Sequence, residues 1–135
     1  MLLSLRTLAL AFWFGGGLAT LFATRAIFRG SPDRKLAGDL SGLVLRSAQF
    51  GRFGWALPFL ASSLAPRGPS FAWGCVALAF AVLQLATDAQ VRALRVRMAN
   101  DESLRARFGA LHGASVMLLV AHVLCAGVAL VVPAQ

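Results

Sequence analysis

Three ionisable residues attract attention because each lies within or beside a long apolar stretch of the chain. His112 and His122 lie ten residues apart on a single predicted helix, and Asp88 lies towards the end of another. Polar groups inside a bilayer are costly and are often functional. Imidazole can ligate haem iron or copper, and a carboxylate can relay a proton or form an ion pair. Together with Ser115, these are the candidate chemical groups.

The spacing of the two histidines argues against a haem held between them. At about 100° and 1.5 Å per residue, ten helical positions separate them by roughly 15 Å along the axis and about 80° around it. Two residues so placed on one helix cannot ligate both sides of one haem, so a symmetric dimer or another ligand would be required. We therefore expect no cofactor, with haem binding through His112 and His122 as an alternative.

Copper is the other metal that this region could hold. His122, Cys125 and Met117, with Met98 as a further donor, suit a soft metal, but no paired Met or Cys motif accompanies them. The simpler interpretation is that His112 bonds a neighbour near the membrane surface and His122 bonds a hydroxyl or carbonyl inside the bundle. The two cysteines are far apart in sequence, and we expect no disulfide.

Asp88 is the carboxylate deepest within an apolar helix and should have a partner. Arg92 is available at i+4, and Arg25 or Arg29 could reach Asp88 if the first and third spanning helices pack together. An ion pair with a structural role is the first expectation, and a proton or substrate relay is the second. No nucleophile–base pair, metal-ligand cluster or phosphate-binding loop is recognisable, so the sequence predicts a protein that is not an enzyme.

The segments that carry these residues indicate an all-α membrane protein. The chain is 59% hydrophobic, and eleven of its thirteen Lys and Arg residues fall within 25–52 and 92–107. Outside these basic segments, the runs 7–24, 71–87 and 108–132 are uncharged and apolar. Such runs satisfy their backbone hydrogen bonds in lipid only as helices. We expect one domain, 1–135.

Four transmembrane helices are predicted, at about 2–28, 47–65, 70–91 and 105–132, with an amphipathic interfacial helix at about 32–46. The interfacial helix would begin with Ser31 as its cap and Pro32 at the first helical position, and it would lie in the headgroup layer or pack on its neighbours. The second span is the shortest, so Arg52 would have to snorkel, and Pro58 should kink it. The third helix should break near Asn100.

The basic segments also predict an orientation. Both join an odd to an even helix, so they share one side, which the positive-inside bias makes cytoplasmic. Both termini would then face the periplasm of a bacterial inner membrane, with the first helix retained rather than cleaved as a signal peptide. The formal charge of +8 would be directed at anionic lipids, not at nucleic acid.

Small residues form two candidate packing seams. Ala11, Gly15, Ala19 and Ala23 recur every four residues, and Gly109 and Gly113 form one such step on the last helix. These seams could meet within the chain or mediate self-association. The leading functional hypothesis is therefore a homo-oligomer or an accessory subunit of a larger membrane complex. The alternative is small-molecule or metal transport, or haem or copper handling, through His112, His122 and Asp88.

Several short motifs resemble one known family. The matching residues are Trp13-Phe14-Gly15-Gly16, Phe28-Arg29, Leu36-Ala37-Gly38, Arg107-Phe108, Leu111-His112 and Ser115. In this order they are similar to the family called domain of unknown function 4149, which includes transmembrane protein 205. The resemblance implies a compact four-helix membrane protein and adds Trp13 to His112 and Ser115 as positions to test. It implies no reaction.

Overall fold

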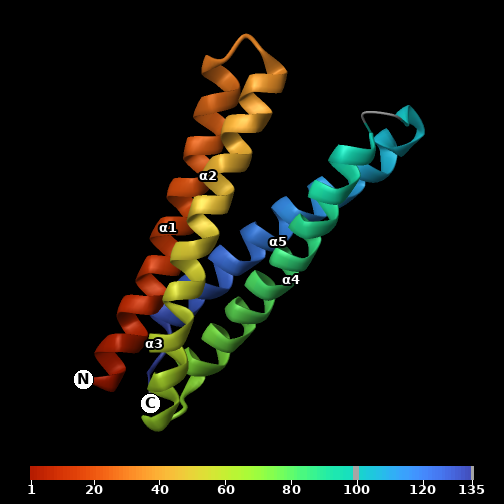
Figure 1. The fold of residues 1–135 in the computed structure, drawn as a ribbon. Coiled ribbons are helices and arrows are strands. Elements are labelled where there is room, and N and C mark those ends of the chain that lie inside the picture. Colours follow the sequence, from red (N-terminus) through yellow and green to blue (C-terminus); the bar gives the residue numbers. More distant parts are fainter. Residues whose placement is uncertain (99–100, 135) are drawn as a thin grey trace.

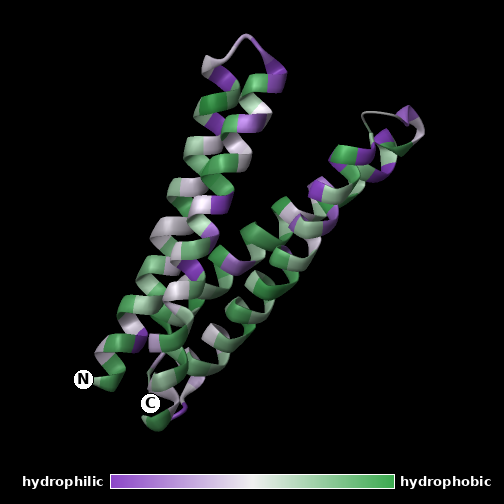
Figure 2. Cartoon of the chain, viewed as in Figure 1, coloured by the Kyte–Doolittle hydropathy of each residue, from purple (hydrophilic) through white to green (hydrophobic). Residues whose placement is uncertain are grey.

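The computed structural model describes residues 1–98 and 101–134, and these are helical with no strand. The elements are α1 (Leu2–Gly30), α2 (Arg34–Gly54), α3 (Ala56–Ala61), the 3-10 turn η1 (Ser62–Leu64), α4 (Pro69–Arg97), the 3-10 turn η2 (Glu102–Leu104) and α5 (Arg105–Val131). Figure 1 shows them as two antiparallel hairpins, α1 with α2 and α4 with α5. The hairpins converge at the end that holds both termini and diverge towards their basic tips (Figures 1 and 2).

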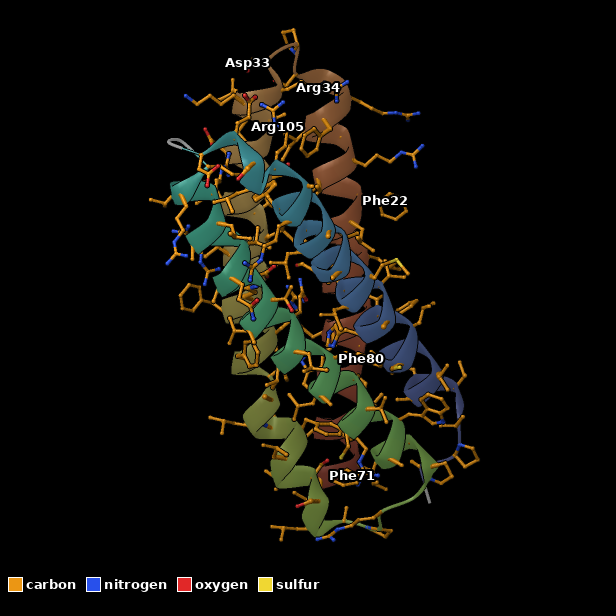
Figure 3. All side chains as sticks on the ribbon, turned by 90° about the vertical axis from the view of Figure 1, so that its right-hand side faces the viewer. Phe22, Asp33, Arg34, Phe71, Phe80 and Arg105 are labelled. Atoms are coloured by element: carbon orange, nitrogen blue, oxygen red, sulfur yellow. The ribbon has the colours of Figure 1, made fainter. Side chains whose placement is uncertain are left out.

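Three helices, α1, α4 and α5, are long and apolar enough to cross a membrane. The distribution of exposed and buried side chains is that of a protein surrounded by lipid. Large apolar side chains such as Phe22, Leu83 and Leu124 are exposed on the outside, and Figure 3 shows Phe22 directed away from the other helices. In contrast, Arg6, Gln84 and His122 are buried. This pattern reverses that of a water-soluble bundle. The chain has the architecture of an integral membrane protein.

The second helix differs from the sequence-based expectation. No break separates an interfacial helix at 32–46 from a span at 47–65, because α2 continues from Arg34 to Gly54 across that boundary and packs along α1. The break comes instead between Gly54 and Ala56. Pro58 accounts for it, since proline lacks the N–H that would bond to the carbonyl of Gly54. The alternative in which this helix packs on its neighbours is the correct one.

The start of α2 also differs by two residues. Asp33, not Ser31, is the cap, because its carboxylate accepts from the backbone N–H groups of Lys35 (2.8 Å) and Leu36 (3.3 Å). Pro32 therefore lies outside the helix. At the other loop, α4 ends at Arg97. The break expected near Asn100 falls outside the described residues.

The small residues used for close packing are not the predicted ones. Ala11, Gly15 and Ala19 lie on an exposed face of α1, and Gly109 and Gly113 are exposed on α5. A Cβ atom added at Gly15, Gly109 or Gly113 would meet nothing within 4 Å. The two expected seams therefore do not meet within the chain, and Ala23 is only half-buried.

Two other glycines allow the close approach of helices. A Cβ atom at Gly17 would overlap the side chain of Val123 on α5, and one at Gly74 would overlap the ring of Phe59. Around them lies the apolar core, in which Trp13 contacts Phe59 with ring centroids 5.0 Å apart. The core occupies the converging half of the molecule. The diverging half contains polar side chains such as Gln49 and Asp88 together with apolar ones such as Leu21 and Phe108.

Candidate functional site: a cavity between the two hairpins

A cavity of about 640 Å³ lies between the hairpins in their diverging half. All four long helices line it, from Arg34 and Met98 near the basic tips to Gln84 and Leu119 at its inner end. The lining thus extends to the basic end, where the α1–α2 and α4–α5 hairpins are furthest apart (Figure 1). Its volume is that of a small-molecule site.

Asp88 forms the centre of the cavity floor. One carboxylate oxygen accepts from the side-chain amide of Gln49 on α2, and the other accepts from the hydroxyl of Ser115 on α5. Three helices from both hairpins therefore meet at this carboxylate. The expected ion pair with Arg92, Arg25 or Arg29 is not formed: within the described chain no arginine lies within 4 Å of Asp88. Asp88 points into the cavity, whereas Arg92 is one turn closer to the mouth.

A further polar contact, between Arg52 and Gln84, lies one helical turn from Asp88 towards the converging end. Arg52 on α2 donates to the side-chain oxygen of Gln84 on α4 at 2.6 Å, and the indole N–H of Trp13 donates to the backbone carbonyl of Arg52 at 2.9 Å. Arg52 is only 4% exposed, so it does not snorkel to the interface as expected. Its Nη2 atom has no hydrogen-bond partner among the described residues.

The depth of the floor follows from helix geometry. Gln84 lies fifteen residues beyond Pro69, which corresponds to about 22 Å along α4, and Asp88 lies about 6 Å further. The hydrocarbon core of a bilayer is ~30 Å thick. Measured from Pro69, the floor therefore lies two thirds or more of that thickness along α4, towards the basic tips.

Five arginines surround the mouth of the cavity: Arg25, Arg34, Arg46, Arg92 and Arg95. Arg95 on α4 bonds Asp39 on α2 at 2.6 Å, which links the hairpins across one side of the mouth. In residues 1–98 and 101–134, the other four have no carboxylate within 4 Å. Their positive charges are therefore available to a ligand. The electrostatic potential of the mouth favours an anion, while Asp88 supplies the negative charge at the floor.

Two hydroxyls on the cavity wall have unused hydrogen-bonding capacity. Ser41 on α2 is buried, Thr24 on α1 is half-buried, and neither hydroxyl has a partner in the described part of the chain. Both residues line the cavity. Buried polar groups are nearly always bonded to protein, water or ligand. These two hydroxyls are therefore positioned to bond a solvent molecule or a ligand.

The histidines have different surroundings. His112 lines the cavity and stacks on Phe108, with ring centroids 6.0 Å apart. His122 is fully buried, packs against Trp13 with the two rings tilted by 56°, and contacts the carbonyl of Ala77 through Nδ1 at 2.9 Å. A carbonyl only accepts, so Nδ1 carries the proton and Nε2 is left as a buried acceptor without a partner. The expected bond from His122 to a carbonyl is thus present.

The structure does not assemble the proposed metal-binding residues. Met117 is 67% exposed on the outside of α5, whereas His122 is fully buried and Cys125 is buried in the core. Within the described residues, no three His, Cys, Asp or Glu side chains are grouped as metal ligands. Both cysteines are free thiols. A haem clasped by His112 and His122 is not supported either, because only His112 faces the cavity.

The arrangement around Asp88 is not that of a hydrolase. Ser115, Asp88 and His112 all line the cavity, but Ser115 donates directly to the carboxylate. In the described chain, no hydrogen bond joins His112 to Ser115 or Asp88. An imidazole between hydroxyl and carboxylate is what activates a serine nucleophile. Ser115, His112 and Asp88 therefore do not form a Ser-His-Asp triad in this arrangement.

Arg25, Asp88, His112 and Ser115 all line this one cavity, as an intramembrane polar site would require. Sequence reasoning missed Gln49 and the wall hydroxyl of Ser41, and it misplaced Arg52. The signal for Gln84 was present, since it precedes Asp88 by one helical turn. Comparison with protein-family models, curated proteins and solved structures finds nothing that matches the chain.

Proposed function

We propose that this chain is an integral membrane protein that binds a small ligand in the cavity between its hairpins. One observation carries the proposal: Gln49, Asp88 and Ser115, from three helices and both hairpins, converge at the inner end of a cavity that opens towards five arginines. Polar groups gathered inside a membrane are functional by default. The role is binding or transport, not catalysis.

The proposal includes four membrane crossings, with α2 and α3 together as the second. Phe50, Leu57 and Leu60 are exposed on the outer side of α2 and α3, while Ser41, Gln49 and Arg52 are buried against the other helices. An apolar outer side and a polar inner side suit a segment placed between lipid and a cavity with a polar floor. The basic tips would face the cytoplasm and both termini the periplasm, as in a transmembrane protein 205-like protein of a bacterial inner membrane.

Cysteine accessibility tests the proposed cavity. In a background with Cys75→Ala and Cys125→Ala, Ser41→Cys should react with a membrane-impermeant thiol reagent applied to the basic side, because Ser41 lines a cavity open to that side. Ala19→Cys is the matched control, since Ala19 is exposed on the outer surface of α1. Labelling of Ala19→Cys but not Ser41→Cys, or of Ser41→Cys only from the opposite side, would contradict the proposal.

Self-association is a second candidate, favoured by the exposed small-residue faces of α1 and α5. Because a Cβ atom at Gly15 or Gly113 meets nothing within the chain, Gly15→Leu and Gly113→Leu should leave the monomer folded. If these faces pack against a second copy or another subunit, the variants should reduce the size of the assembly. An unchanged size in both variants would remove this candidate. A native mass spectrum would also reveal resident haem or copper, and we propose neither.

A further inference from the structure

A second, smaller cavity of about 390 Å³ lies on the lipid-facing side of α2 and α4. Its lining consists of Arg46, Gln49, Phe50, Phe53, Leu85 and Arg92. Three of these, Arg46, Gln49 and Arg92, also line the central cavity. The two cavities are therefore neighbours, separated by those three side chains. A molecule in the outer groove could reach the central cavity between α2 and α4.

The groove has a basic end and an apolar end on both walls. Phe53 follows Arg46 by seven residues on α2, and Leu85 precedes Arg92 by seven residues on α4. The two helices run in opposite directions (Figure 1). Both arginines therefore lie towards the basic tips, and both apolar residues lie about 10 Å further from those tips. Phe50 is 76% exposed at this surface, although it is a large aromatic residue.

The depth of each end corresponds to a layer of the bilayer. Arg92 lies twenty-three residues beyond Pro69, or about 35 Å along α4, which is beyond a hydrocarbon core of ~30 Å that begins near Pro69. Leu85 lies at about 24 Å, within that core. The arginines are thus at the level of phosphate groups, and the apolar wall is at the level of acyl chains.

We infer that this groove binds an amphiphile with an anionic phosphate headgroup, taken from the leaflet at the basic end. Its phosphate would lie between Arg46 and Arg92, and its acyl chain would lie against Phe50, Phe53 and Leu85. Guanidinium groups suit phosphate because they donate in pairs. Neither arginine has a carboxylate within 4 Å in the described part of the chain. This inference rests on the proposed function, because the two arginines that would hold the phosphate also line the central cavity.

Retention of lipid tests the inference. The purified protein is incubated with an equimolar mixture of phosphatidylglycerol and phosphatidylcholine, and the lipid that remains bound after detergent exchange is measured. Arg46→Gln with Arg92→Gln should lower retained phosphatidylglycerol by about tenfold, since each arginine contributes to headgroup binding. Arg29→Gln with Arg97→Gln is the matched control, because it removes the same charge from the same end outside both cavities. Equal losses in the two double variants would overturn the inference.

A second experiment distinguishes a lipid ligand from a soluble phosphate ester by comparing two tryptophan variants of α4. Leu85→Trp should fill the groove and abolish retention of phosphatidylglycerol while leaving binding of glycerol phosphate unchanged. Leu83→Trp, which is exposed on the other side of α4, should affect neither. If glycerol phosphate binds as well as phosphatidylglycerol and Leu85→Trp changes neither, the ligand is a soluble phosphate ester. That result would overturn the lipid inference and leave the proposed function in place, whereas an unlabelled Ser41→Cys would remove the function itself.

Discussion

Arg6 joins several segments of the chain at the converging end of the molecule. It is 1% exposed, and its guanidinium donates to the hydroxyl and carbonyl of Ser62 and to the carbonyls of Pro66 and Ala134. The same group lies over the ring of Phe71, 5.1 Å from its centroid. One side chain on α1 thereby joins η1, the following loop, α4 and the chain terminus. A buried charge is tolerated here because carbonyl oxygens surround it.

Replacing Arg6 should destabilise the protein strongly. Arg6→Ala leaves several buried acceptors without donors and removes a large buried side chain, which should cost about 3 kcal/mol or more. Thermal unfolding in detergent would show a lower Tm. Arg67→Ala serves as the control at the same end, because Arg67 is exposed and donates only to the carbonyl of Ser63. A Tm for Arg6→Ala as high as that of Arg67→Ala would refute this role.

Replacing glycine with alanine should have different effects on stability at Gly17 and at Gly15, which lie within one helical turn. Gly17→Ala would place a Cβ atom against Val123, whereas Gly15→Ala would place it in open space. The first should lower stability by about 1–3 kcal/mol through overpacking. The second should be neutral or slightly stabilising, because alanine favours a helix more than glycine does. Guanidine or detergent titration of both variants, followed by circular dichroism, measures the difference, and equal stabilities would contradict the packing described.

At the scale of elements, α2 is the helix with the most unusual composition. Its outer side carries exposed leucines, and its inner side carries Ser41, Gln49 and Arg52. It begins at a side-chain cap and ends where Pro58 interrupts the backbone hydrogen bonds. This helix places both Gln49 and Arg52, which form the two polar pairs with α4.

The cap of α2 should contribute measurably to stability. Asp33→Ala removes the acceptor for two backbone N–H groups and should cost about 1 kcal/mol. Asp33→Asn should retain most of that stability, since asparagine is an equally good cap. Hydrogen exchange of the first turn of α2 measures the effect locally. Equal protection in the alanine and asparagine variants would show that the cap is unimportant.

The sequence predicted the three long apolar helices correctly but not the course of α2. Uncharged runs predicted α1, α4 and α5, because length and hydropathy are properties of the segment itself. The course of α2 was misread, because a polar inner side within a membrane and a polar outer side at its surface produce the same periodicity. Asp88 was recognised as a site residue from its depth in α4, and Ser115 was also named as a candidate. The contact between them and the whole contribution of Gln49 were not predicted, since helix register between hairpins is not encoded locally.

At the scale of the whole molecule, α2 and α4 link the two hairpins at two levels. At the floor, Gln49 donates to Asp88 beside the Arg52–Gln84 pair, and these groups are buried or half-buried. At the mouth, Arg95 bonds Asp39, but both side chains are about half-exposed. Exposed ion pairs contribute little. The floor should therefore hold the hairpins together, while the mouth is free to admit a ligand.

The two aspartates allow this difference to be measured. Asp88→Leu leaves the Gln49 amide and the Ser115 hydroxyl without their acceptor, which should cost about 2 kcal/mol or more. Asp39→Leu removes only the exposed link and should cost less than about 1 kcal/mol. Both replace an aspartate with the same residue on one of the two facing helices. A larger loss of Tm in Asp39→Leu than in Asp88→Leu would reverse this assignment.

A native mass spectrum of the protein released gently from its own membrane tests the central claim, a ligand bound between the hairpins, most directly. We expect the wild-type spectrum to show a mass excess that is lost in Ser41→Trp, which fills the cavity, and kept in Ala19→Trp, which alters the outer surface of α1. An excess that persists in Ser41→Trp, or a wild-type protein without any excess, would contradict the account.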